Sequence, residues 1–227
     1  MRQLVLLVGL IVSLSNTADA QKDSTTRADS AGTHARAWIV PIGVVASTTI
    51  DPELREWALH SHSRSLNHLA HLVNPLGTAR VLVPAMAVFY AGSLLDHSTS
   101  MQHSALLTAA AYIAGDAAES ILKPVVGRER PYASGNSHRF RPFTSGGDWH
   151  SFPSAHVAHI TSIAEAISMQ TNSRSLSFTC DALVALVGWD RIYEDQHWTS
   201  DVMATIALTA MISSASVRWI RSRWSDH

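Results

Sequence analysis

The chain has 227 residues, a length that one ordinary domain accommodates. Its formal net charge of -1 gives no bulk attraction for a polyanion, so no nucleic-acid partner is predicted. Apolar residues make up 46% and charged residues 15%, which is apolar for a soluble domain and leaves a membrane surface as a candidate partner. The abundance of Ala, Leu and Val among the apolar positions favours helices over strands.

The first twenty residues have the pattern of a secretory signal peptide. Arg2 provides a positive start, Leu4–Leu14 is an apolar run, and Ala18-Asp19-Ala20 is a small-x-small cleavage site. A membrane anchor is the alternative interpretation, but the apolar run is short for a bilayer span. We therefore expect residues 1–20 to be removed and the protein to be exported. In a bacterium that means the periplasm or the outer face of the cytoplasmic membrane.

Residues 21–36 are polar and small, and are predicted to form a flexible N-terminal segment ahead of one domain at 37–227. That domain is predicted to be all-α, a helical bundle of about six core helices with its active site at helix ends and loops. The expected apolar or amphipathic segments are Ala37–Ile50, Asp51 to Val73, Ala79–Leu95, Gln102–Leu122, His156–Gln170, Phe178–Val187 and Asp201–Arg221. The single cysteine, Cys180, is expected to be a buried structural thiol.

The start and end of the second segment carry recognisable signals. Asp51 is expected to be an N-cap with Pro52 at the first helical position, and Asn74-Pro75 with Gly77 to end the helix. Whether the bundle is soluble or integral to a membrane stays open. Ala79–Leu95 and Val202–Val217 are apolar enough to be candidates but short of a clean span, and Gln102–Leu122 contains two acidic residues that lipid disfavours.

A basic motif follows the fourth segment. Pro124 and Gly127 are expected to end the helix at Lys123, and Pro131 holds the preceding Arg130 in an extended conformation. A lysine and an arginine placed in this way can converge on one anion. The alternative is a solvated basic turn that also includes Arg128.

A second motif, Pro153-Ser154-Ala155-His156, opens the next predicted helix. Ser154 is a natural N-cap, and the free backbone N–H groups of a helix start, including that of Ala155, bind anions. His156 would lie at the edge of that anion site, where it could act as a general acid. A plain N-cap with an incidental histidine is the alternative, because the chain contains 13 histidines.

The third motif is Asp190-Arg191 followed by His197 and Asp201. Residues four apart share one face of a helical turn, so the Asp201 carboxylate is expected to hold one ring nitrogen of His197 and leave the other free to attack. Arg191 adds a positive charge for phosphoryl oxygens. An ordinary capping pair at the start of the last helix is the alternative.

Together the three motifs resemble the type 2 phosphatidic acid phosphatase (PAP2) superfamily, which also contains lipid phosphate phosphatases, bacterial class A acid phosphatases and vanadium haloperoxidases. The family pattern is K-x6-R-P, then P-S-G-H, then S-R-x5-H-x3-D. The matching residues are Lys123, Arg130, Pro131, Pro153, Ser154, His156, Arg191, His197 and Asp201. Two positions depart from the pattern, Ala155 in place of Gly and Asp190 in place of Ser.

The resemblance implies a phosphohistidine mechanism without a metal. His197 attacks phosphorus, Asp201 orients it, and His156 protonates the leaving oxygen and then activates water. The phosphate-binding groups would be Lys123, Arg130, Ser154, Ala155 and Arg191. Alanine keeps the backbone N–H, whereas the Asp190 carboxylate adds a negative charge that could weaken anion binding or tune Arg191.

The predicted function is therefore that of an exported, metal-independent phosphatase for a phosphomonoester, or for a lipid phosphate or pyrophosphate. No cofactor is expected, and vanadate is expected as an inhibitor or an alternative cofactor. Two alternatives remain, a vanadate-dependent haloperoxidase-like oxidoreductase and a non-catalytic helical protein that binds anionic lipid. The identity of the substrate and the oligomeric state are not predicted.

Overall fold

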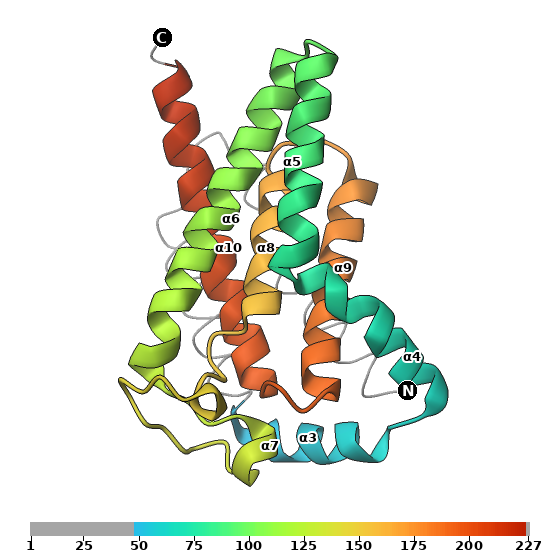
Figure 1. Ribbon diagram of the computed structural model, residues 1–227, viewed down its shortest axis with the longest axis vertical. Helices are drawn as coiled ribbons and strands as arrows, with labels where there is room; N and C mark the ends of the chain where they lie inside the picture. Colours follow the sequence, from blue (N-terminus) through green and yellow to red (C-terminus); the bar gives the residue numbers. More distant parts are fainter. Residues whose placement is uncertain (1–47, 226–227) are drawn as a thin grey trace, which may run out of the picture.

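The computed structural model describes residues 48–225, and every regular element in that range is helical (Figure 1). The eight α-helices are α3 (Asp51–His60), α4 (Arg64–Val73), α5 (Ala79–Leu95), α6 (Thr99–Val126), α7 (Pro131–Ser134), α8 (Ala155–Ser168), α9 (Arg174–Tyr193) and α10 (Thr199–Ser225). Two short 3₁₀ helices, η1 (Asn74–Gly77) and η2 (Gly147–Trp149), complete the set. The predicted all-α class is confirmed. The predicted signal peptide, the flexible segment and most of Ala37–Ile50 lie outside the described residues.

Helix α8 is the centre of the bundle. It packs against α6, α9 and α10, and most of its residues are buried, including Val157, Ile160 and Ala164. The main apolar cluster joins these α8 residues to Val184 of α9 and Val202 of α10. Cys180 is buried and unpaired, as predicted.

Four helix ends meet at one end of the bundle. Figure 1 shows α6 and α9 running toward that end and α8 and α10 starting from it, while α3 lies across it. The connection from α9 to α10 and the connection from α6 to α8, including the long segment between α7 and α8, also lie there. The three sequence motifs occur at these four ends, so the topology brings them together.

Several element boundaries differ from prediction. The amphipathic segment that starts at Asp51 breaks into α3 and α4, because Ser63 is extended and caps α4 by accepting a hydrogen bond from the Leu66 N–H. Asp51 is the first residue of α3, not its N-cap. Helix α6 continues through Pro124 and ends at Gly127, whose φ of 57° is left-handed. Pro124 has no N–H to donate to the Ser120 carbonyl, so it removes one hydrogen bond of the helix, and only Val125 and Val126 follow it before α6 ends.

Among residues 48–225, two helices are long and apolar enough to cross a membrane, Thr99–Val126 and Thr199–Trp224. The pair Arg64–Gly77 and Ala79–Leu95 passes the same test as one bent span, with a 54° angle at its break. In α5 only Ser93 is buried, and large apolar side chains such as Val88, Phe89 and Leu95 are exposed. A helix that is apolar and exposed on several sides is suited to a lipid environment.

Candidate active site

The three predicted phosphate-binding cations lie close to both motif histidines. The charges of Lys123, Arg130 and Arg191 act on each imidazole, although the three residues come from α6, the following loop and α9. Arg130 is extended, with φ -71° and ψ 150°, as its position before Pro131 predicts. Its guanidinium donates to the Gly147 carbonyl at 3.1 Å and to the side-chain oxygen of Gln196 at 2.9 Å.

His197 is almost completely buried just before the start of α10. Its Nδ1 lies 2.5 Å from the carbonyl oxygen of Ser151, and no other described residue hydrogen-bonds to the ring. A carbonyl oxygen can only accept, so Nδ1 carries the proton and Nε2 keeps its lone pair. Burial and the charges of Arg130 and Lys123 hold the pKa of the His197 imidazole well below its usual 6.5. The ring is therefore neutral, with one nitrogen available as a nucleophile.

The expected contact between Asp201 and the ring of His197 is not present. The carboxylate instead accepts from Arg128 Nη1 at 2.6 Å, from Ser151 Oγ at 2.5 Å and from the Trp198 N–H at 3.1 Å. His197 precedes the first turn of α10, so the helical spacing that predicted the contact does not apply to it. Asp201 acts on His197 through Ser151, whose hydroxyl binds the carboxylate and whose carbonyl binds the ring.

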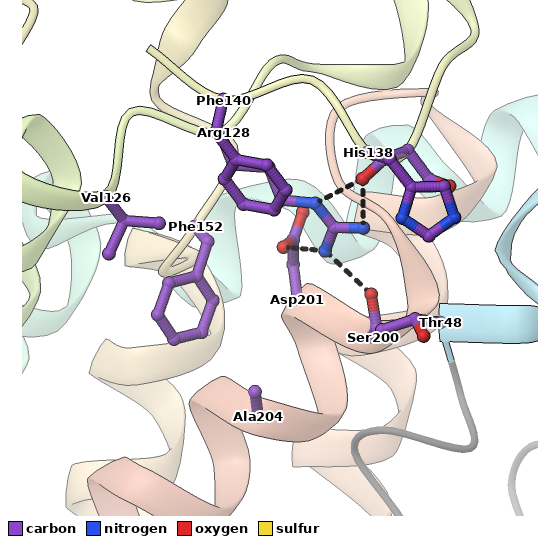
Figure 2. Close-up of a pocket in the computed structure, with 10 residues that line it drawn as sticks. Thr48, Val126, Arg128, His138, Phe140, Phe152, Ser200, Asp201 and Ala204 are labelled. Atoms are coloured by element: carbon purple, nitrogen blue, oxygen red, sulfur yellow. Dashed lines mark hydrogen bonds and ion pairs between the residues drawn. The ribbon is translucent and has the colours of Figure 1, made fainter. Parts of the chain in front are cut away.

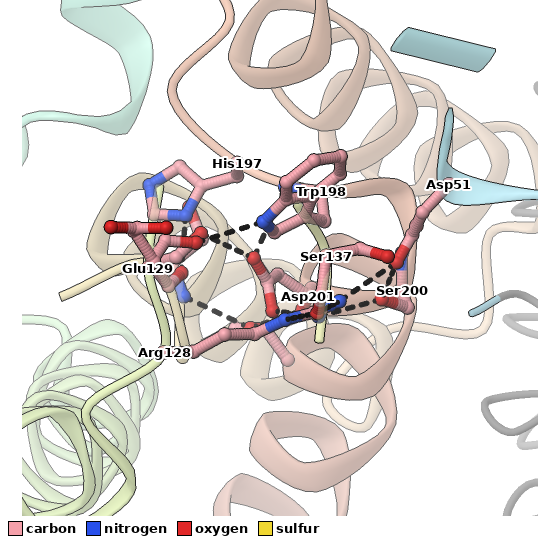
Figure 3. Close-up of polar contacts among 11 residues, drawn as sticks. Asp51, Arg128, Glu129, Ser137, His197, Trp198, Ser200 and Asp201 are labelled. Carbon is pink, nitrogen blue, oxygen red and sulfur yellow. Dashed lines mark hydrogen bonds and ion pairs between the residues drawn. The ribbon is translucent and has the colours of Figure 1, made fainter. Parts of the chain in front are cut away.

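Arg128 is the residue whose importance sequence reasoning missed. Its side chain is buried and donates to Asp51 Oδ2 at 2.8 Å, to Ser200 Oγ at 2.7 Å and to the Ser137 carbonyl at 3.1 and 2.9 Å, in addition to Asp201 (Figure 3). Two carboxylates and a carbonyl thus surround one guanidinium. The arginine is not part of a solvated basic turn. Its partners are far apart in the sequence, and only the unusual run of three basic residues at 123–130 hinted at it.

Ser154 occupies the N-cap position of α8, as predicted, but its side chain makes no capping hydrogen bond. Its hydroxyl oxygen is buried and has no partner among the described residues, while its backbone N–H donates to Thr205 Oγ1 at 3.0 Å. Ala155 is the first residue of α8, where backbone N–H groups have no partner within the helix. A buried hydroxyl and free N–H groups together suit an anion.

His156 is only partly buried and has one side-chain contact, 3.2 Å from its Nε2 to the side-chain oxygen of Asn74. Burial and the charges of Arg191 and Lys123 lower the pKa of His156 to about 3. Gly77 lies against it, since a Cβ added there would be 2.6 Å from the Cβ of His156. The 3₁₀ turn η1 therefore positions this histidine.

A second buried histidine was not singled out from the sequence. His159, one turn after His156, contacts the Gly77 carbonyl at 2.9 Å through Nδ1 and Asp116 Oδ1 at 2.8 Å through Nε2. It ties η1 to both α6 and α8. Nothing in the sequence marks it apart from its position on a buried helix face.

One pocket lies beside the Arg128 network and not at the cation cluster. Figure 2 shows this pocket beside Arg128 and Asp201, with apolar walls that include Phe140 and Phe152. Its volume is about 180 Å³. None of the three cations predicted to bind phosphate, and neither motif histidine, lines it. Within residues 48–225, no group of three or more His, Cys, Asp or Glu side chains is placed to hold a metal ion.

Comparisons with known proteins identify the family of the chain. The crystal structure of the first transmembrane PAP2-type phosphatidylglycerolphosphate phosphatase from Bacillus subtilis has a similar fold, with a TM-score of 0.62 and 17% sequence identity over 98% of both chains. No curated protein sequence matches. The model of the PAP2 superfamily matches residues 104–225, which include all three motifs and more than half of the chain. The chain therefore belongs to the PAP2 superfamily.

Proposed function

We propose that the protein is an exported, metal-independent phosphatase that hydrolyses a phosphomonoester or a lipid phosphate or pyrophosphate through a phosphohistidine intermediate. The observation that carries the proposal is the state of His197. Its Nδ1 is held by a carbonyl, its Nε2 is unprotonated, and three cations lie close by. That combination supplies a nucleophile and compensates the charge of the phosphoryl group it attacks.

In the proposed first step, Nε2 of His197 forms a bond to phosphorus while the bond from phosphorus to the leaving oxygen breaks. Lys123, Arg130 and Arg191, with the Ser154 hydroxyl and the backbone N–H of Ala155, stabilise the equatorial oxygens. His156 gives its proton to the leaving oxygen. A bound phosphate offsets the cations that lower the pKa of His156, so substrate binding itself favours the protonated ring.

In the second step, His156 removes a proton from water, the water oxygen attacks phosphorus, and the phosphorus–nitrogen bond breaks. Phosphate leaves and His197 returns to its neutral form. Asp201 and Arg128 touch no reacting atom in this scheme. They hold Ser151, and Ser151 holds the nucleophile.

The membrane-facing features support a lipid substrate. The site lies at one end of α6 and α10, both long enough to span a bilayer, and α5, which packs against α6, exposes apolar side chains. A site at the end of a span lies near the lipid headgroups, so a lipid can present its phosphate while its chains stay in the bilayer. The Bacillus subtilis structure with this fold is named for a lipid phosphate substrate.

The test is phosphate release by the detergent-solubilised full chain in a chelator, on soluble esters, lipid phosphates and isoprenoid pyrophosphates. We expect turnover on at least one of them, sensitivity to vanadate, and loss by at least about 10⁴-fold in His197→Gln. His68→Gln, in an exposed histidine of α4, is the matched control and should keep full activity. Acid-labile, base-stable phosphate label on the wild type but not on His197→Gln identifies the intermediate. Full activity of His197→Gln refutes the proposal.

A further inference from the structure

Two of the three cations in the site already have a carboxylate partner within the protein. Lys123 pairs with Glu119 one turn earlier in α6, and Arg191 pairs with its neighbour Asp190. Arg130 differs, because its partners are two carbonyl groups and an amide oxygen, all uncharged. These three cations and their two carboxylate partners together carry a net charge of plus one.

The pair of Asp190 and Arg191 is held tightly. Both Nε and Nη2 of Arg191 donate to the same carboxylate oxygen of Asp190, Nε at 2.8 Å. Asp190 is completely buried, and its other oxygen has no hydrogen-bond partner among residues 48–225. The negative charge of Asp190 is therefore compensated by Arg191, and the Nε–Nη2 edge of this guanidinium is not available to a ligand, which can use only its remaining N–H groups on Nη1 and Nη2.

We propose that Asp190, acting through Arg191, restricts the phosphate site to singly charged phosphoryl groups. The proposal rests on the function proposed above and specifies the ionic form of its substrate. A dianion placed beside Arg191 also meets the Asp190 carboxylate, and in a buried site little water screens that repulsion. A monoanion, such as a phosphate that keeps one proton, matches a net charge of plus one.

Binding of two inert anions measures this preference without any turnover. Sulfate is doubly charged and methyl sulfate is singly charged across the neutral range, so one pH suffices and no ligand titrates. We expect wild-type protein to bind methyl sulfate at least as tightly as sulfate by isothermal titration calorimetry. In Asp190→Asn, which has almost the same shape, sulfate affinity should rise by about tenfold while methyl sulfate affinity changes less.

The matched control is Asp195→Asn. Asp195 also binds an arginine with two hydrogen bonds, 2.7 and 2.8 Å to Arg55, but Arg55 is not one of the predicted phosphate-binding cations. Asp195→Asn removes the same charge as Asp190→Asn, and it should leave the ratio of the sulfate and methyl sulfate affinities unchanged. A general effect of net charge would instead change the ratio in both variants.

Sulfate binding to wild type much more tightly than methyl sulfate overturns the proposal, and this needs no variant to fold. An unchanged ratio in Asp190→Asn, or no binding of either anion, also overturns it. The expected ratios in a protein that hydrolyses no phosphoester would uphold the charge preference and refute the phosphatase. Turnover together with a preference for sulfate would uphold the phosphatase and refute the charge preference.

Discussion

His197 and His156 lie at the same end of the bundle, yet the protein holds one ring far more firmly than the other. His197 is nearly fully buried and bound to a carbonyl that is itself fixed by Asp201 and Arg128. His156 is partly exposed and has a single long contact to Asn74. The orientation of the nucleophile is thus fixed before substrate arrives. The position of the proton donor depends largely on the short turn η1, and its protonation depends on the charge of the substrate.

The surroundings of the two histidines should also contribute differently to the stability and to the activity of the protein. The network behind His197 joins α3, the loop after α6 and α10, so it belongs to the framework of the fold. The η1 turn beside His156 carries fewer polar contacts. Changes behind the nucleophile should therefore reduce stability and activity together, and changes beside the acid should reduce mainly activity.

The largest effect is expected for Arg128→Leu. It leaves the buried carboxylates of Asp51 and Asp201 without their cation, and breaking a buried ion pair in this way costs about 3–5 kcal/mol of unfolding free energy. Denaturant unfolding monitored by circular dichroism measures the loss. Arg55→Leu, in the more exposed pair with Asp195, is the control and should cost about 1 kcal/mol or less.

If Arg128→Leu does not fold, Asp51→Asn removes one partner and leaves the bond to Asp201. It should lower both the unfolding midpoint and kcat. A variant at Asp51 or Arg128 that loses activity with unchanged stability would contradict the role given to this network.

A smaller effect is expected for Gly77→Ala, in the region of the acid. The new Cβ would lie 2.6 Å from the Cβ of His156 and 3.0 Å from its Cα, so the histidine must move. A displacement of about 1 Å of a catalytic group can lower kcat about 100-fold, while overpacking costs about 1–3 kcal/mol of stability. Steady-state kinetics and thermal unfolding on the same sample separate the two losses.

Gly92→Ala is the matched control, because the Cβ it adds meets no atom within 4 Å beyond its chain neighbours and the backbone of its own helix. It should keep full activity and gain slightly in stability, since alanine favours a helix over glycine. Equal kcat for Gly77→Ala and wild type would show that η1 does not position the acid.

The smallest effect is a change in pH dependence. His197 must be neutral to attack, and its lowered pKa keeps it neutral as the pH falls below 6.5, so the acid limb of kcat/KM should lie below that value. Lys123→Met removes one of the charges that lower this pKa. The acid limb should then move to higher pH, whereas Lys123→Arg should leave it in place. A limb that moves equally in both variants would mean that shape, not charge, sets the pKa.

Sequence alone predicted the helical class and the motif positions at helix ends, because both follow from local patterns. Cys180 and the extended Arg130 are as predicted for the same reason. The network of hydrogen bonds and ion pairs behind His197 could not be predicted, because Arg128 binds partners 73 and 77 residues away in the sequence. The Asp201 contact was misplaced because helical spacing was applied to His197, which precedes the helix.

The bond between Asp51 and Ser200 has a consequence for the order in which the protein assembles. These residues are 149 positions apart, so most of the chain is synthesised before the Asp51 carboxylate meets its partners on α10. Arg128 can pair with the Asp51 carboxylate earlier, but the bonds from the Ser200 N–H and hydroxyl form only after the last helix arrives, so α3 is less firmly held across the bundle until then. Chains that stop short of α10 should therefore keep this end open to proteases, and limited proteolysis near α3 would report whether synthesis was completed.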